Sequence, residues 1–285
     1  MSNLTFLRNS ITLFALSAAM ASAAPPAAPP AATLLERGYA EMYNLQFKEA
    51  HESFRQWQEL HPEDPMGPVS DAAAYLFSEF DRLHILQSEF FTHDQHFITD
   101  HKLLPDPALK KSFQAAIQSS RSLAARRPND KDALFATILC SGLESDYTAL
   151  IEKRYGASLQ QMKTGRAMAE RLLAQDPTYY DAWIAVGVEN YMLSVKPAPV
   201  RWILRLGGAQ TDRAFGLEKL KLTAEKGHYL APFAKLLLAV AALRDQDTES
   251  ARVLLAGLTR EYPHNPLYRQ ELGRMTSLAF RSAPR

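Results

Sequence analysis

Residues 38–62, GYAEMYNLQFKEAHESFRQWQELHP, decide the expected fold of this chain. Gly38 lies twelve residues before Ala50. Phe54 follows Ala50 by four residues, and Pro62 follows Phe54 by eight. Small residues let two antiparallel helices approach closely, an aromatic ring fills the space between them, and a proline ends the second helix. The stretch therefore predicts a helical hairpin.

Parts of this pattern return along the chain, as Ala116 and Pro128, Ala169, Leu172 and Pro177, Trp183 and Gly187, Ala251, Leu255, Leu258 and Pro263, and Leu272 and Gly273. The spacings resemble those of the tetratricopeptide repeat (TPR) family. The resemblance implies an α-solenoid of TPR-like helical hairpins, wound as a right-handed superhelix. Apolar residues also recur at helical spacing from Leu34 onward, without the alternation typical of strands. We therefore expect an all-α protein of ten to thirteen helices.

Two stretches, residues 91–106 and 194–211, fit no repeat and are expected to be irregular insertions. After the second, Gly216, Leu220 and Thr223 have the spacing of a delayed second helix. We expect Gly227 to end that helix in the left-handed conformation that glycine adopts easily. Residues 208–217 are also distantly similar to a passage in the inclusion-body clearance repeat proteins, which implies kinship with an adaptor-like family and no catalytic activity.

The N-terminus has the layout of a secretory signal peptide: Arg8, an apolar run from Ile11 to Met20, and the small residues Ala21, Ser22 and Ala23. We expect a signal peptide over 1–23, a Pro/Ala-rich tether over 24–33, the repeat domain over 34–280 and a basic tail over 281–285. A retained membrane helix is the alternative, although the run is shorter than the roughly 20 residues that span a bilayer.

The only cysteine, Cys140, does not follow the apolar run, so we expect no lipid anchor and no internal disulfide. The expected location is periplasmic or extracellular. The formal charge of +1 becomes 0 when Arg8 leaves with the signal peptide, which argues against nucleic acid as a partner. Later apolar stretches, such as 233–243 with Lys235 inside it, predict buried helices, so we expect no integral membrane segment after cleavage.

In TPR arrays the first helix of each hairpin lines the concave groove, and the resemblance therefore implies where a partner binds. Aromatic, methionine and amide side chains on these helices suit a peptide or a partner helix. The residues selected are Tyr39, Met42, Tyr43, Leu139, Leu143, Asn190, Tyr191 and Met192. The alternative is that half of them only pack between neighbouring repeats.

Two polar stretches carry residue types that are common in catalytic and metal sites. His93, His96 and His101, with two aspartates, are possible zinc ligands, but their spacing fits no established motif and favours a solvated loop. Glu144 and Asp146 open a polar stretch, completed by Tyr147, Glu152, Lys153 and Arg154, that favours a salt-bridged helix surface. We therefore predict no metal and no cofactor.

The sequence contains no nucleophile elbow, zinc-binding His-Glu-x-x-His helix or phosphate-binding loop. Cys140 follows an apolar run and is expected to be a buried small hydrophobe. The predicted function is a scaffold or adaptor, not an enzyme, that binds a protein or peptide partner in its concave groove. A metal-dependent or carboxylate-based hydrolase on a helical scaffold is the alternative, and self-assembly through the end repeats is a third possibility.

The second insertion contains residues 200–206, VRWILRL, which are apolar apart from two arginines. Such a short helix suits a membrane surface or the rim of a groove, but seven residues bury too little for stable membrane binding. We expect it to pack back onto the repeats.

Overall fold

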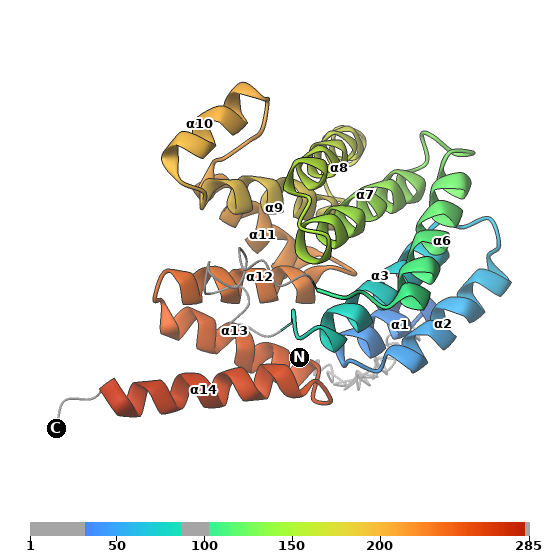
Figure 1. Cartoon of the computed structure of the whole chain (residues 1–285). Coiled ribbons are helices and arrows are strands. Elements are labelled where there is room, and N and C mark those ends of the chain that lie inside the picture. The colour runs from blue at the N-terminus through green and yellow to red at the C-terminus, as the bar shows by residue number, and fades with distance from the viewer. Residues whose placement is uncertain (1–31, 87–102, 283–285) are drawn as a thin grey trace, which may run out of the picture. The chain divides into compact units, whose positions relative to one another are not determined.

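The computed structural model describes residues 32–86 and 103–282, with side chains up to Met275. The described residues contain twelve α-helices and no strand, which confirms the all-α prediction and falls within the expected number of helices (Figure 1). Residues 32–285 group into one compact unit. The predicted signal peptide and most of the tether, together with the histidines of the first insertion, lie outside the described residues.

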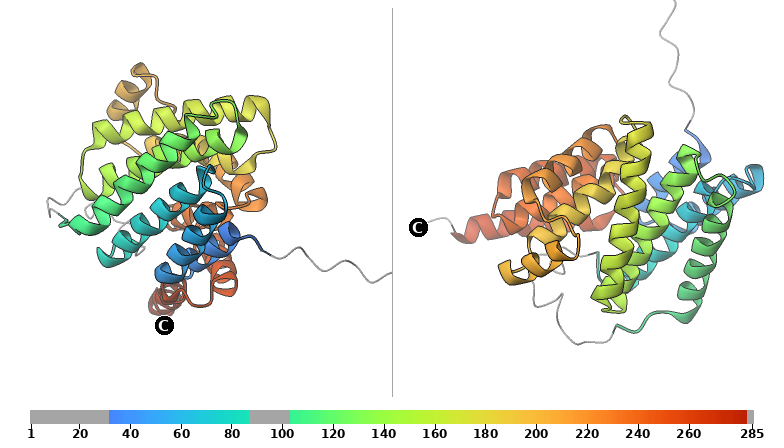
Figure 2. Two further views of the ribbon diagram at one scale, coloured as in Figure 1. Left: turned by 90° about the vertical axis from the view of Figure 1, so that its right-hand side faces the viewer. Right: turned by 90° about the horizontal axis from the view of Figure 1, so that it is seen from above.

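The helices are α1 (Leu34–Tyr43), α2 (Phe47–Leu60), α3 (Met66–Arg82), α6 (Pro107–Ala124), α7 (Lys131–Asp146), α8 (Tyr155–Gln175), α9 (Trp183–Ser194), α10 (Ala198–Leu206), α11 (Arg213–Lys226), α12 (Ala231–Arg244), α13 (Thr248–Glu261) and α14 (Pro266–Ser282). A π-helical turn, Tyr147–Ile151, follows α7, and a 3-10 turn, Tyr180–Ala182, precedes α9. Each helix packs mainly against the next one along the chain, except that α9 packs against α11 and leaves α10 to one side (Figures 1 and 2).

The first hairpin is built as the spacing of its residues predicts. Ala50 and Phe54 are fully buried, and a methyl group on Gly38 would overlap the Phe54 ring. Helix α2 ends at Leu60, before Pro62. The close approach of α1 and α2 is therefore confirmed, and it depends on glycine at position 38.

Helices α9 and α11 make a second close pair across the insertion. A Cβ atom on Gly216 would lie 2.6 Å from the backbone nitrogen of Tyr191, and one on Gly187 would lie 3.0 Å from the Leu220 side chain. Leu220 and Thr223 are fully buried. The delayed second helix predicted from these residues is thus present as α11.

The expected left-handed cap at Gly227 is wrong. Gly227 has φ −64° and ψ 146°, an extended conformation. Glycine is needed there because a Cβ atom would lie 2.6 Å from the Thr223 carbonyl oxygen and 2.7 Å from the Asp181 carboxylate. The buried Asp181 side chain accepts hydrogen bonds from the backbone N–H groups of His228, Tyr229 and Leu230 at 2.9, 3.1 and 2.9 Å. These bonds, and not a cap motif, direct the chain from α11 into α12.

The first helix contacts segments close to the end of the domain. The Tyr43 hydroxyl donates to the Tyr229 carbonyl at 3.1 Å, and the Asn265 side-chain amide donates to the Tyr43 carbonyl at 2.9 Å. The His264 backbone N–H donates to the Asn44 side chain at 3.0 Å. Helix α1 is therefore held by hydrogen bonds against the segments that precede α12 and α14.

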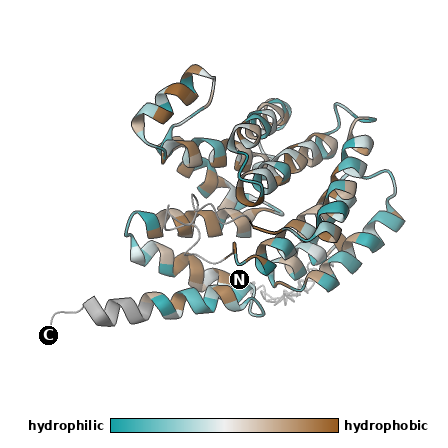
Figure 3. Ribbon diagram, in the orientation of Figure 1, coloured by the Kyte–Doolittle hydropathy of each residue, from teal (hydrophilic) through white to brown (hydrophobic). Residues whose placement is uncertain are grey.

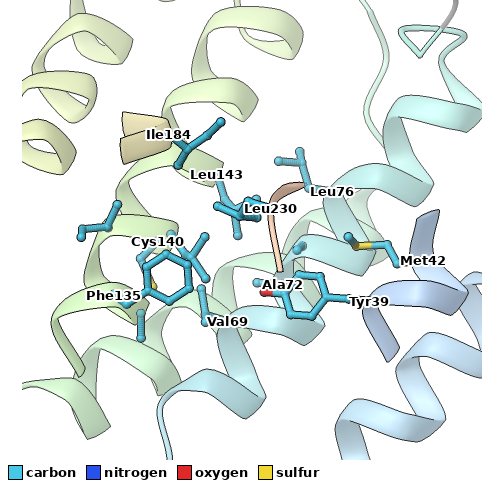
Figure 4. Packing of buried hydrophobic residues seen from close by; sticks show 14 of the residues in the cluster. Tyr39, Met42, Val69, Ala72, Leu76, Phe135, Cys140, Leu143, Ile184 and Leu230 are labelled. Atoms are coloured by element: carbon cyan, nitrogen blue, oxygen red, sulfur yellow. The ribbon is translucent and has the colours of Figure 1, made fainter. Parts of the chain in front are cut away.

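The main hydrophobic core extends from α1 to α12. Figure 4 shows Leu76, Leu143 and Leu230, from three separate segments, close together within it. Cys140 is fully buried in the same cluster, and burial raises the pKa of its thiol to about 11. It is a small buried hydrophobe, as its surroundings in the sequence predicted.

Helix α10 does not pack closely onto the other helices, which corrects the expectation for the second insertion. None of its residues is buried, and the Trp202, Ile203 and Leu206 side chains are 65%, 63% and 70% exposed. Figure 3 shows hydrophobic residues on this helix, and Figure 1 shows it standing apart from the other helices. Across the part of the chain that the structure describes, no helix is both long and apolar enough to cross a membrane.

Candidate binding cavity

Seven of the eight residues predicted to contact a partner line one cavity of about 430 Å³. Tyr39, Met42 and Tyr43 come from α1, Leu139 and Leu143 from α7, and Tyr191 and Met192 from α9. These three helices are far apart in the sequence, so their convergence follows from the packing order of the domain. The partner-binding role of these residues remains a prediction.

Asn190 is the exception, because it does not line this cavity. Its amide donates to the Val186 carbonyl at 3.0 Å and to the Gln210 side chain at 2.8 Å. Its carbonyl oxygen accepts from the Asp212 backbone N–H at 3.0 Å. Asn190 is fully buried and connects α9 to the insertion that leads to α11.

The rest of the cavity wall is mostly apolar and includes residues of α3, α8 and α12, helices without a predicted contact residue, and a further residue of α9. Half-buried apolar side chains contribute to this wall: Phe77 from α3, Met162 from α8, Val188 from α9, and Phe233, Leu236 and Leu237 from α12. A site of this size lined by apolar and aromatic groups is typical of binding pockets. The cavity therefore suits an apolar ligand or the apolar side chains of a larger partner.

The two tyrosines of α1 are part of the wall and also hold it together. The Tyr39 ring lies 4.9 Å from that of Tyr229, and the Tyr43 ring lies 5.4 Å from that of Tyr262, centroid to centroid. The Tyr39 hydroxyl accepts from Ser70 at 3.2 Å. Both tyrosines are at most 5% exposed. Part of their role is thus packing between helices, in line with the alternative interpretation of this residue set.

Asp146 is the one carboxylate in the wall for which the described residues provide no hydrogen bond or ion pair. It is the last residue of α7, is partly exposed and lines the cavity. Burial alone raises the pKa of this carboxyl from its usual 3.8 to about 7. The site therefore contains a carboxyl group that changes charge near neutral pH.

A stripe on one face of α7 leads to this carboxylate. Leu139, Gly142, Leu143 and Asp146 are three or four residues apart, share a helix face and all line the cavity. The π-helical turn begins at the next residue, and such turns are frequent at functional sites. The two leucines were predicted to contact a partner. The same helical spacing places Gly142 three residues after Leu139 and Asp146 three residues after Leu143, which would have added both residues to the prediction.

Three charged residues of the polar stretch, Glu144, Glu152 and Arg154, form the ion pairs that were expected there. Glu144 pairs with Arg121 of α6, and Glu152 pairs with Lys110 at 2.9 Å and with Arg154 at 3.2 Å. Glu144 does not line the cavity, so it and Asp146 face different surroundings. Asp146 and Tyr147 depart from the predicted exposed character of this stretch, because Asp146 lines the cavity and Tyr147 is 5% exposed.

The remaining charged groups of the wall lie on α12 and α14. Glu271 accepts from Arg274 at 2.9 Å, and Arg244 lies at the C-terminal end of α12. The Tyr191 hydroxyl is buried without a hydrogen-bond partner. In residues 32–86 and 103–275, no group of three His, Cys, Asp or Glu side chains is arranged to hold a metal ion.

No protein-family model matches the chain, and neither a curated protein nor a solved structure is significantly similar to it.

Proposed function

We propose that this chain is an exported, TPR-like α-solenoid with a right-handed superhelical winding that binds an apolar segment of a protein or peptide partner. In this proposal the cavity between α1, α7, α9 and α12 is the binding site, and the protein performs no catalysis. The observation that carries it is the convergence of Tyr39, Leu143 and Met192, each chosen from a different repeat, on one apolar cavity.

The wall is formed before a partner arrives, which supports a binding role. The hydrogen bonds of Tyr43 and Asn265 and the three bonds of Asp181 fix the segments that enclose the cavity. A site that is already ordered avoids the entropy cost of ordering side chains and loops on binding. Side chains such as Phe77 and Phe233, which are only half-buried, then provide the apolar surface that a partner covers.

Asp146 favours a second candidate, the carboxylate-based hydrolase. A carboxyl group whose pKa lies near 7 suits general acid–base catalysis. Glu144, the second carboxylate of that hypothesis, pairs with Arg121 instead of facing the cavity. The two carboxylates that this hypothesis pairs, Glu144 and Asp146, therefore do not meet in the cavity, and the binding function is the better supported of the two.

Gly142 makes a direct test of the proposed function possible. It lines the cavity, is exposed, and has no atom within 4 Å of the place where a Cβ would lie. Gly142→Phe is therefore expected to fill the cavity without disturbing the packing of α7. Gly156→Phe is the matched control, since Gly156 has the same open surroundings outside the cavity.

The test is selection of a phage-displayed library of random peptides on the protein and on both variants, with helical content checked by circular dichroism. We expect apolar peptides to be enriched on the unmodified protein and on Gly156→Phe, and to be lost on Gly142→Phe. Equal recovery on Gly142→Phe would show that the peptides bind elsewhere. Absence of enrichment on the unmodified protein would reject the peptide-binding function.

A further inference from the structure

Asp146 places a carboxylate in a cavity wall that is otherwise mostly apolar. Its carboxylate has no cationic partner among the described residues, and the wall around it is dominated by leucine, methionine and aromatic side chains. An ionised group in apolar surroundings is unfavourable unless a partner of opposite charge compensates it. Leu143 of the same helix face and Met162 of α8 belong to this wall but supply no such partner.

The other charged groups in the wall lie on different helices. Glu271 and Arg274 of α14 pair with each other, and Arg244 is at the end of α12. Burial raises the pKa of the Asp146 carboxyl, and no hydrogen bond or ion pair joins it to any of these three groups. The compensating charge is therefore not provided by the described part of the wall.

Space for a partner group lies on the same helix face. Gly142 precedes Asp146 by four residues, so the two positions are neighbours on α7. The place where a Cβ of Gly142 would lie is open, whereas the corresponding places at Gly38 and Gly216 are filled by Phe54 and by the backbone of Tyr191. A glycine in a helix interior costs about 1 kcal/mol relative to alanine. Here the space that it leaves is next to the unpaired carboxylate and opens into the cavity.

We infer that the cavity binds an apolar peptide segment that carries a lysine, and that the lysine ammonium pairs with the Asp146 carboxylate. This inference rests on the proposed peptide-binding function and specifies the chemistry of the peptide. Lysine suits the site because its ammonium is compact and its flexible stem is apolar, so that the stem packs along the wall at Gly142 and Leu143 while the charge reaches Asp146.

The test uses isothermal titration calorimetry at about pH 8, where Asp146 is ionised, with three synthetic peptides. Each is N-acetylated and C-amidated and consists of alanine and leucine flanked by serines. They differ at one central position, which is lysine, norleucine or glutamate. The protein is compared with Asp146→Asn, which keeps the shape of the side chain, and with Asp176→Asn, which removes a carboxylate on the outside of the fold. n-Decylamine and n-decanol are the small-molecule controls.

We expect the lysine peptide to bind the unmodified protein roughly 10-fold or more tightly than the norleucine peptide, because truncating one partner of a buried charge pair has effects of this size or larger. The glutamate peptide should bind most weakly. Asp146→Asn should bind the lysine and norleucine peptides alike, and Asp176→Asn should behave as the unmodified protein.

Equal binding of the lysine and norleucine peptides to the unmodified protein would overturn the pairing with Asp146 and leave the peptide-binding function intact. A lysine preference that survives in Asp146→Asn would also overturn it. If no peptide binds, both the inference and the proposed function fail. Binding of n-decylamine in preference to n-decanol without any peptide binding would replace the peptide with a small cationic amphiphile.

Discussion

Replacing Asp146 by asparagine should stabilise this protein, and by an amount that depends on pH. The substitution removes a carboxyl group that has no ion-pair partner among the described residues and keeps its size and shape. In the folded state burial raises the pKa of Asp146 from 3.8 to about 7. Between these two values the folded protein holds a proton that the unfolded chain has lost.

The sign and the size of the effect follow from this difference. Because the folded state binds more protons between pH 3.8 and about 7, the free energy of unfolding falls as the pH rises through this window. A shift of about three pKa units corresponds to about 4 kcal/mol, at 1.36 kcal/mol per unit. Asparagine does not titrate, so Asp146→Asn should gain about 4 kcal/mol relative to the unmodified protein between pH 4 and pH 8.

The assay is urea unfolding followed by circular dichroism, with both proteins measured at about pH 4, 6 and 8. Other titrating groups, including the buried Asp181, are present in both proteins and cancel in the difference. Asp176→Asn is the control, and it should lower the free energy of unfolding where Asp146→Asn raises it. A hydrogen bond from Lys131, followed by bonds from Thr178, lowers the pKa of the Asp176 carboxyl to about 2. Its stabilising contribution is therefore present above pH 3.8 and is lost as the pH falls towards 2.

A difference between Asp146→Asn and the unmodified protein that stays constant from pH 4 to pH 8 would refute this reasoning. Destabilisation by Asp146→Asn at pH 8 would refute it more strongly, because it would mean that the carboxylate has a favourable partner in the folded protein.

Three further substitutions test the fold by the same unfolding assay. Gly216→Ala should destabilise the protein by about 1–3 kcal/mol, because the added methyl group meets the backbone nitrogen of Tyr191 at 2.6 Å; an unchanged stability would show that α9 and α11 are not in close contact. Asp181→Ala should cost at least about 2 kcal/mol, since it leaves three backbone N–H groups without their acceptor, and Asp181→Asn should cost less. Trp202→Ala should change the stability by less than about 0.5 kcal/mol because this side chain is 65% exposed; a larger loss would place α10 against the rest of the domain.

The first hairpin was predictable because its signal is local and steric. The spacing of Gly38, Ala50 and Phe54 specifies which residues meet between two neighbouring helices, and the structure shows that contact. Helical spacing also identified the residues of α1 and α7 that lie on one side of each helix. All five of those predicted residues line the cavity.

Other features depended on contacts between distant segments, which no local pattern contains. Gly227 carries the signature of a helix cap, yet hydrogen bonds from the following residues to Asp181 give it an extended conformation. Asn190 follows the helix pattern of its neighbours, but its partners are Gln210 and Asp212 in the insertion. Its position could not be found without knowing where that insertion folds.

The predictions for Asp146 and α10 were wrong for the same reason. Polar residues were predicted to be exposed and apolar residues to be buried. A carboxylate was assigned to the surface, although its spacing from Leu139 and Leu143 places it on the cavity face of α7. Conversely, the apolar residues of α10 were expected to be buried. The Arg201 side chain of that helix donates to the Lys196 carbonyl at 2.9 Å, and Trp202 and Leu206 remain exposed.

The most direct test of the binding function is photo-cross-linking from inside the cavity in the cells that produce the protein. A photoreactive p-benzoylphenylalanine is placed at Phe77, which lines the cavity, or at Trp202, which is exposed on α10. We predict that irradiation gives a defined adduct from position 77, that Gly142→Phe abolishes it, and that mass spectrometry identifies its cross-linked segment as apolar with a lysine. An adduct that forms only from position 202, or one from position 77 that survives Gly142→Phe, would contradict the assignment of the cavity as the binding site.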